Sequence, residues 1–82
     1  MTQPQRVIEY IRRQGSITRA EALNDLGIAN LTAVIAHIRH KIGLDVITLM
    51  MDTENRYGEP CRYARYTILA KELKAYDERK KK

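Results

Sequence analysis

The chain has 82 residues, enough for one domain with a modest hydrophobic core. Hydrophobic residues make up 44% and charged residues 30%, as in globular domains, and a net charge of +5 favours a polyanionic partner. The single cysteine, Cys61, excludes a scaffold of intramolecular disulfides.

The first residues contain no apolar signal-peptide core. No apolar run approaches the roughly 18 residues that span a bilayer. We therefore expect a cytoplasmic protein that does not bind membranes.

The first predicted element is a helix over residues 4–14. Pro4 suits its first turn, where the missing N–H costs nothing. Its apolar residues recur at helical spacing: Val7, Ile8 and Ile11. Gly15 ends the helix, and Ser16–Ile17 is predicted to be a very short extended segment.

A second helix is predicted over residues 19–26. Thr18 and Glu21 have the spacing of a capping box, in which each side chain bonds the backbone N–H of the other residue. Gly27 ends the helix. Three of its apolar residues are expected to face inward: Ala22, Leu23 and Leu26.

A third helix is predicted from about residue 30 to residue 42, after the turn Ile28–Asn30 and before Gly43. One side carries an apolar stripe: Leu31, Val34, Ile35, Ile38 and Ile42. The opposite side carries small or polar residues: Ala29, Thr32, Ala33, Ala36, His37, Arg39 and His40.

A β-hairpin is predicted next, with its tip at Asn55–Gly58. Pairing Asn55 with Gly58 puts Leu49 opposite Ala64 and collects one mostly apolar face: Ile47, Leu49, Ala64, Tyr66 and Ile68. The same register pairs Met50 with Tyr63 on the outer face.

Residues 1–69 are expected to form the domain and residues 70–82 a basic tail. Leu69, Leu73 and Tyr76 have helical spacing, which is compatible with a short final helix. Residues 77–82 are all charged and are expected to be disordered.

This order of elements is that of a winged helix-turn-helix: an α+β fold, mainly α, with three helices and a hairpin wing. In that fold the third helix enters a DNA major groove. Its outer face is slim and polar, and we predict major-groove contacts from Ala29, Asn30, Thr32, Ala33, Ala36, His37 and His40. We predict DNA backbone contacts from Arg19, Arg39 and Lys41. The alternative is an ordinary amphipathic surface helix.

The wing supplies the second predicted contact, to the DNA backbone or a minor groove, from Arg56, Tyr57, Arg62 and Arg65. The predicted register turns Arg62 inward, which makes it the weakest candidate. The alternative is salt bridging within the hairpin, which also carries Asp52, Glu54 and Glu59. Further basic residues are candidates for contacts with the DNA backbone: Arg6, Arg12, Arg13 and the tail Lys80–Lys82.

The runs Gly15–Ala22 and Leu26–Ile28, followed by the hairpin end Ala64–Tyr66, resemble the small winged helix-turn-helix domains of bacteriophages and prophages. The resemblance covers roughly residues 5–69. It implies binding to double-stranded DNA in a bacterial host cell, as a transcriptional regulator or as an excisionase-like factor that bends DNA for recombination. A homodimer or cooperative binding on DNA would supply the specificity that one small interface lacks.

Other functions find less support in the sequence. His37 and His40 form an i, i+3 pair, but a zinc site needs further ligands and Cys61 would have to come from the hairpin. Ser16 is the only serine, and no phosphate-binding glycine loop is present, so we expect no enzyme, metal or cofactor. The rival is a winged helix that binds a host protein through an exposed apolar spot at Met50 and Tyr63.

Overall fold

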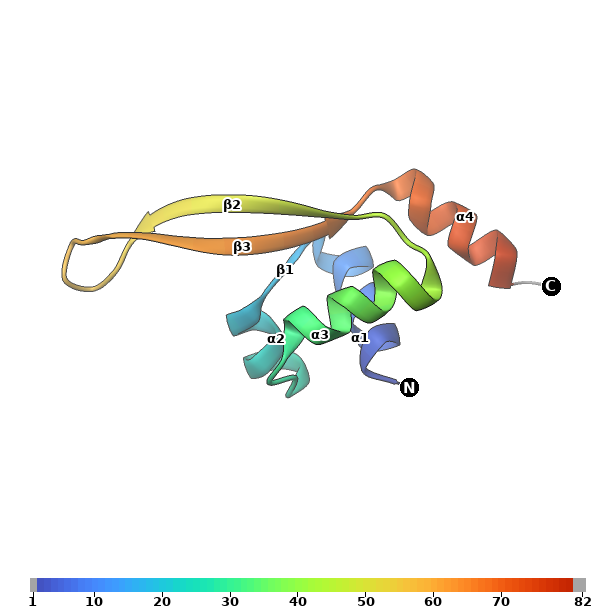
Figure 1. Ribbon diagram of the computed structural model, residues 1–82, viewed down its shortest axis with the longest axis horizontal. Helices are drawn as coiled ribbons and strands as arrows, with labels where there is room; N and C mark the ends of the chain where they lie inside the picture. The colour runs from blue at the N-terminus through green and yellow to red at the C-terminus, as the bar shows by residue number, and fades with distance from the viewer. Residues whose placement is uncertain (1, 81–82) are drawn as a thin grey trace.

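The computed structural model describes residues 2–80. Three helices form a bundle, and a long two-stranded hairpin projects from it (Figure 1). The elements in chain order are α1 (Gln3–Gln14), β1 (Ile17–Thr18), α2 (Arg19–Leu26), α3 (Leu31–His37), a π-helical turn η1 (Ile38–Ile42), β2 (Val46–Glu54), β3 (Pro60–Ile68) and α4 (Ala70–Lys80). The predicted winged-helix order is therefore confirmed.

The predicted signals at the ends of α1 and α2 are confirmed. Thr18 N donates to Glu21 Oε1 at 2.9 Å, and Glu21 N donates to Thr18 Oγ1 at 3.2 Å, which completes the capping box. Gly15 and Gly27 end the helices with φ of 92° and 69°, a left-handed conformation that glycine adopts without steric cost.

The core lies where the helices meet the base of the hairpin. The predicted stripe of α3 is buried, with Ile42 half-buried at its end. Leu23 is 56% exposed, so the prediction that it faces inward was wrong. On α2, Ala22 is the residue that points at the core, and Leu23 lies about 100° further round the helix. Ile28, in the turn after α2, takes the core position expected for Leu23, and only 1% of the Ile28 surface is exposed.

The sheet is antiparallel in the order β1-β3-β2, and its predicted register was wrong by one residue. Leu49 pairs with Arg65, and Met50 pairs with Ala64. The cause is the loop, which has three residues rather than two. Asn55 N donates to Glu59 O, and Gly58 N donates to Asn55 O, both at 3.0 Å. Gly58 has φ of 76°, as in a type I turn followed by a left-handed glycine.

The shift exchanges the two faces of β2 and leaves those of β3 as predicted. Val46 now shares the buried face with Tyr66 and Ile68. Ile47 and Leu49, expected inside, lie on the outer face. The predicted pair of Met50 with Tyr63 does not form.

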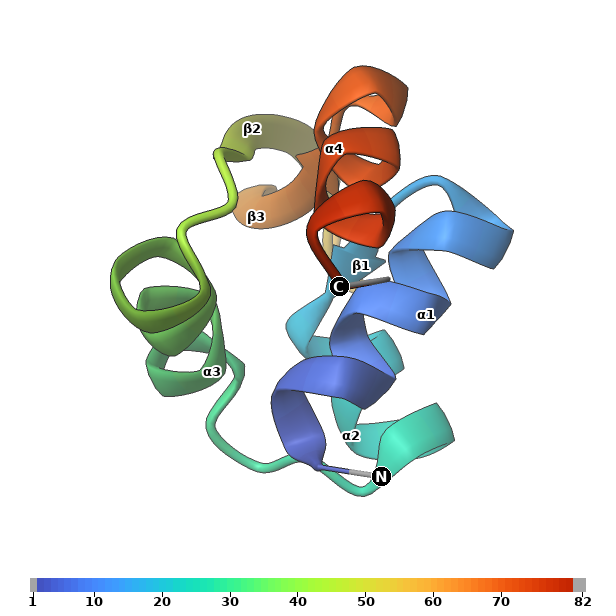
Figure 2. The same cartoon turned by 90° about the vertical axis from the view of Figure 1, so that its right-hand side faces the viewer.

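The structure also differs from the expected disorder after residue 76. Helix α4 continues to Lys80 and lies beside α1 (Figure 2). Leu73 is buried in the core, and Arg12 holds Asp77 through two hydrogen bonds of 2.5 and 2.8 Å. Such a bidentate pair fixes the direction of the helix. Lys81 and Lys82 of the predicted basic tail lie outside the described residues.

Candidate nucleic-acid interface

The outer face of α3 and η1 is solvent-exposed along its whole length. Its exposed residues are Thr32, Ala33, Ala36, His37, Arg39, His40 and Lys41, and Ala29 is exposed in the turn before it. Residues 26–44 contain no aspartate or glutamate, while Arg39 and Lys41 add positive charge. The buried stripe fixes the helix on the bundle, so a slim face without carboxylates is held toward solvent.

Asn30 is the N-cap of α3. Its Oδ1 accepts a hydrogen bond from Ala33 N at 3.2 Å. The cap directs the carbonyl oxygen at the helix backbone, and the NH2 group of the same amide can donate to a base or a phosphate.

Arg39 ties the end of the helix to the hairpin. Its Nη2 donates to Val46 O at 2.7 Å and to Thr48 Oγ1 at 2.8 Å. These two bonds hold the guanidinium against β2, so Arg39 positions the helix, whereas Lys41 is the cation that points into solvent. The π-helical bond from Gly43 N to Ile38 O, 2.9 Å long, adds one residue to the turn that carries Arg39.

The tip of the wing is exposed and locally rigid. Tyr57 is 77% exposed, and Arg56 beside it is also exposed. Asn55 Oδ1 accepts hydrogen bonds from Tyr57 N at 2.9 Å and from Glu59 N at 3.1 Å. These bonds fix the loop that presents Arg56 and Tyr57.

The other two wing arginines have partners within the protein. Arg62 Nε lies 2.9 Å from Asp52 Oδ1, so the salt bridging within the hairpin that was the alternative prediction does occur. Both side chains are more than 70% exposed, so this pair adds little stability. Arg65 Nη1 donates to Ser16 Oγ at 2.7 Å, approaches Glu21 Oε1 at 3.5 Å and thereby joins the wing to α2.

A family model described as a winged helix-turn-helix domain matches residues 2–71. The chain belongs to this family. Comparisons with curated proteins and with solved structures give no significant match. The winged helix-turn-helix is a DNA-binding fold, and α3 is the second helix of its helix-turn-helix.

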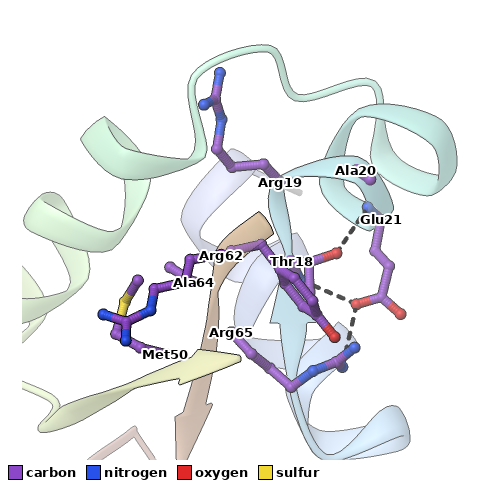
Figure 3. Close-up of a pocket in the computed structure, with 9 residues that line it drawn as sticks. Thr18, Arg19, Ala20, Glu21, Met50, Arg62, Ala64 and Arg65 are labelled. Carbon is purple, nitrogen blue, oxygen red and sulfur yellow. Dashed lines mark hydrogen bonds and ion pairs between the residues drawn. The ribbon is translucent and has the colours of Figure 1, made fainter. Parts of the chain in front are cut away.

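The winged-helix domain has a groove that the sequence did not predict, between the first turn of α2 and the wing. It encloses about 650 Å³. Its lining includes Arg19, Met50, Arg62 and Ala64 (Figure 3). Figure 3 shows Arg62 beside Met50, with Arg19 pointing away from them. The groove depends on contacts between residues that are distant in sequence, and no local pattern indicates it.

Residues 2–80 contain neither a cluster of metal ligands nor a membrane-spanning helix. No three histidine, cysteine or carboxylate side chains in this part of the chain lie close enough together to hold a metal ion. None of its helices has the length and apolar content needed to cross a bilayer.

Proposed function

We propose that this winged-helix protein binds double-stranded DNA sequence-specifically. Helix α3 enters the major groove, and the wing lies on the neighbouring backbone or in a minor groove. The observation that carries the proposal is the exposed, carboxylate-free face of α3, which is held rigidly by the buried stripe beneath it.

The side chains divide by what they offer DNA. Ala29, Ala33 and Ala36 let the helix backbone approach the bases closely. Donors and acceptors for base edges come from Thr32, His37 and His40, with the Asn30 amide group at the start of the helix.

The backbone contacts come from other elements. Arg19 and Lys41 are exposed cations suited to phosphates, and Arg56 and Tyr57 reach out from the wing tip. Arg39 and Arg65 act indirectly, because they hold α3 and α2 against the hairpin.

The biological role is proposed from the resemblance to bacteriophage domains. We infer a transcriptional regulator of a phage or another mobile element, acting in the cytoplasm of a bacterial host. A second role, DNA bending for recombination, is favoured by the exposed Tyr57 at the end of a long wing, because aromatic wedges unstack base steps. Gel mobility of DNA fragments with the site at different positions separates a bending factor from a regulator that leaves DNA straight.

The test of the interface is Ala36→Glu on α3. The new carboxylate would face the DNA and be repelled by it, so we expect the affinity for duplex DNA to fall at least about tenfold. Ala75→Glu is the matched control, because Ala75 is also exposed on a helix but lies on α4. Equal affinities for the two variants, measured by fluorescence anisotropy, would refute the assignment of α3 as the reading helix.

Protein binding is the competing function. The observation in its favour is the exposed apolar surface of the wing, where Leu49 is 43% and Met50 58% exposed. A wild-type protein that does not bind duplex DNA at low salt would favour this function.

A further inference from the structure

Strand β2 is an edge strand of the sheet, and Arg39 contacts its first residues through Val46 O and Thr48 Oγ1. It pairs with β3 on one side only, since the strand order is β1-β3-β2 (Figure 1). Asn55 N donates to Glu59 O, so these two residues form a hydrogen-bonded pair. Hydrogen-bonded and non-hydrogen-bonded pairs alternate along β2 and β3 from that point. It follows that one set of residues turns its N–H and C=O groups away from β3: Val46, Thr48, Met50, Asp52 and Glu54.

This edge lacks several of the features that usually prevent strands from pairing, and its charged residues, Asp52 and Glu54, are confined to the distal end. Val46–Glu54 contains no proline and no lysine, and its pairing with β3 runs without a bulge. Leu49 and Met50 are 43% and 58% exposed. Apart from Val46 O, which accepts from Arg39, the outward backbone groups of β2 are not paired with β3. A long strand edge of this kind is suited to receive another strand.

The charges along the edge are complementary to those of a second copy in the antiparallel direction. Asp52 and Glu54 lie in the distal half of β2, and both are exposed. Arg39 lies at the proximal end, bonded to Val46 O and Thr48 Oγ1. Two antiparallel copies bring the acidic end of each strand to the arginine of the other.

We propose that two copies of this chain pair through β2, antiparallel and about a two-fold axis at Met50. Thr48 then faces the partner's Asp52, and the partner's Glu54 lies opposite Val46, beside Arg39. On the outer face Leu49 lies against the partner's Met51. In this register every outward backbone group from Thr48 to Asp52 meets a complementary group, and no two like charges are opposed.

Pairing of two β2 strands does not depend on DNA binding. The two-fold axis is perpendicular to the joined sheet, so both α3 helices stay on the same side of it. Two α3 helices related by such an axis could each contact one half-site of a two-fold symmetric DNA sequence.

Met50→Pro tests the pairing. The N–H of Met50 points away from β3, so proline removes no bond from the hairpin but blocks the partner strand. We expect sedimentation equilibrium to show a monomer–dimer system whose Kd rises at least about tenfold in Met50→Pro. Met50→Ala, which keeps the N–H, is the matched control and should retain the larger part of the association. A wild-type protein that is monomeric at all concentrations, or a dimer that proline leaves intact, overturns the proposal.

Cross-linking tests the register independently and covers the case in which the proline variant fails to fold. In a Cys61→Ser background, Met50→Cys places two thiols opposite each other, within the Cα separation that a disulfide spans. Thr53→Cys is the control, because Thr53 faces the partner's Ile47 and not its own copy. Oxidation should link the Met50→Cys chains and leave Thr53→Cys unlinked. Equal linking of both variants, or of neither, contradicts the proposed pairing.

Discussion

Tyr10 and Asp25 join α1 to α2 through their side chains. Tyr10 Oη donates to Asp25 Oδ2 at 2.7 Å. This hydrogen bond, with smaller effects of desolvation and of the nearby Glu21 charge, raises the pKa of Tyr10 from 10.0 to about 12. Because the folded pKa is the higher one, the contact stabilises the fold fully below pH 10 and is lost as the pH rises through about 12.

We therefore predict that Asp25→Asn lowers the pKa of Tyr10 toward 10, since it removes the carboxylate that favours the neutral phenol. Ultraviolet titration of tyrosinate measures the change, with Tyr10→Phe identifying the band of Tyr10. Asp45→Asn, in the loop before β2, is the control and should leave the titration of Tyr10 unchanged. A Tyr10 that ionises near 10 in the wild type would contradict the contact.

Thr18 is the one buried polar residue of the described core and starts α2. Thr18→Ala removes the acceptor for Glu21 N, so we expect the free energy of unfolding to fall by about 1 kcal/mol. Thr18→Ser keeps the hydroxyl and should recover the larger part of that loss. Urea denaturation measures both variants, and equal losses would show that the cap contributes nothing.

At the scale of elements, α4 is fastened to the bundle by a core residue and by an ion pair. Leu73 is 9% exposed, and Asp77 binds Arg12. Leu73→Ala should lower the free energy of unfolding by about 2 kcal/mol or more, because it leaves a cavity. Leu69→Ala is the matched control at 43% exposure and should change it by about 0.5 kcal/mol or less. Similar losses in denaturant titrations would mean that α4 is not part of the folded unit.

The helices could be predicted from the sequence because their signals are local. The capping box at Thr18 and the glycines that end α1 and α2 act over a few residues, and the structure confirms them. The hairpin register could not be predicted in the same way. Strand β2 carries apolar residues on both faces between Val46 and Met51, so its pattern permits two registers. The three-residue loop decides between them.

Some geometric features of the candidate site follow from the sequence and others do not. The exposed face of α3 follows from helical periodicity. The tethering of Arg39 and Arg65 does not, because a basic side chain in a sequence carries no sign of its partner. Arg65 meets Ser16 at a separation of 49 residues, a contact that only the folded sheet creates.

The whole molecule is elongated, with extents of 51 × 23 × 22 Å, because the wing projects from the bundle. Its positive charge is distributed over both parts, with Lys41 on the helix side and Arg56 at the wing tip. DNA that contacts both would be held at two separated points, so the phosphate contacts should contribute additively to the affinity.

The most direct test of DNA binding is a salt titration of the affinity for duplex DNA, followed by fluorescence anisotropy. We predict that the logarithm of the binding constant falls linearly with the logarithm of salt concentration, with a slope of about −0.9 for each phosphate contact. Lys41→Ala and Arg56→Ala should each make this slope less negative by about one. An affinity that does not change with salt, or no binding at low salt, would contradict the proposed function.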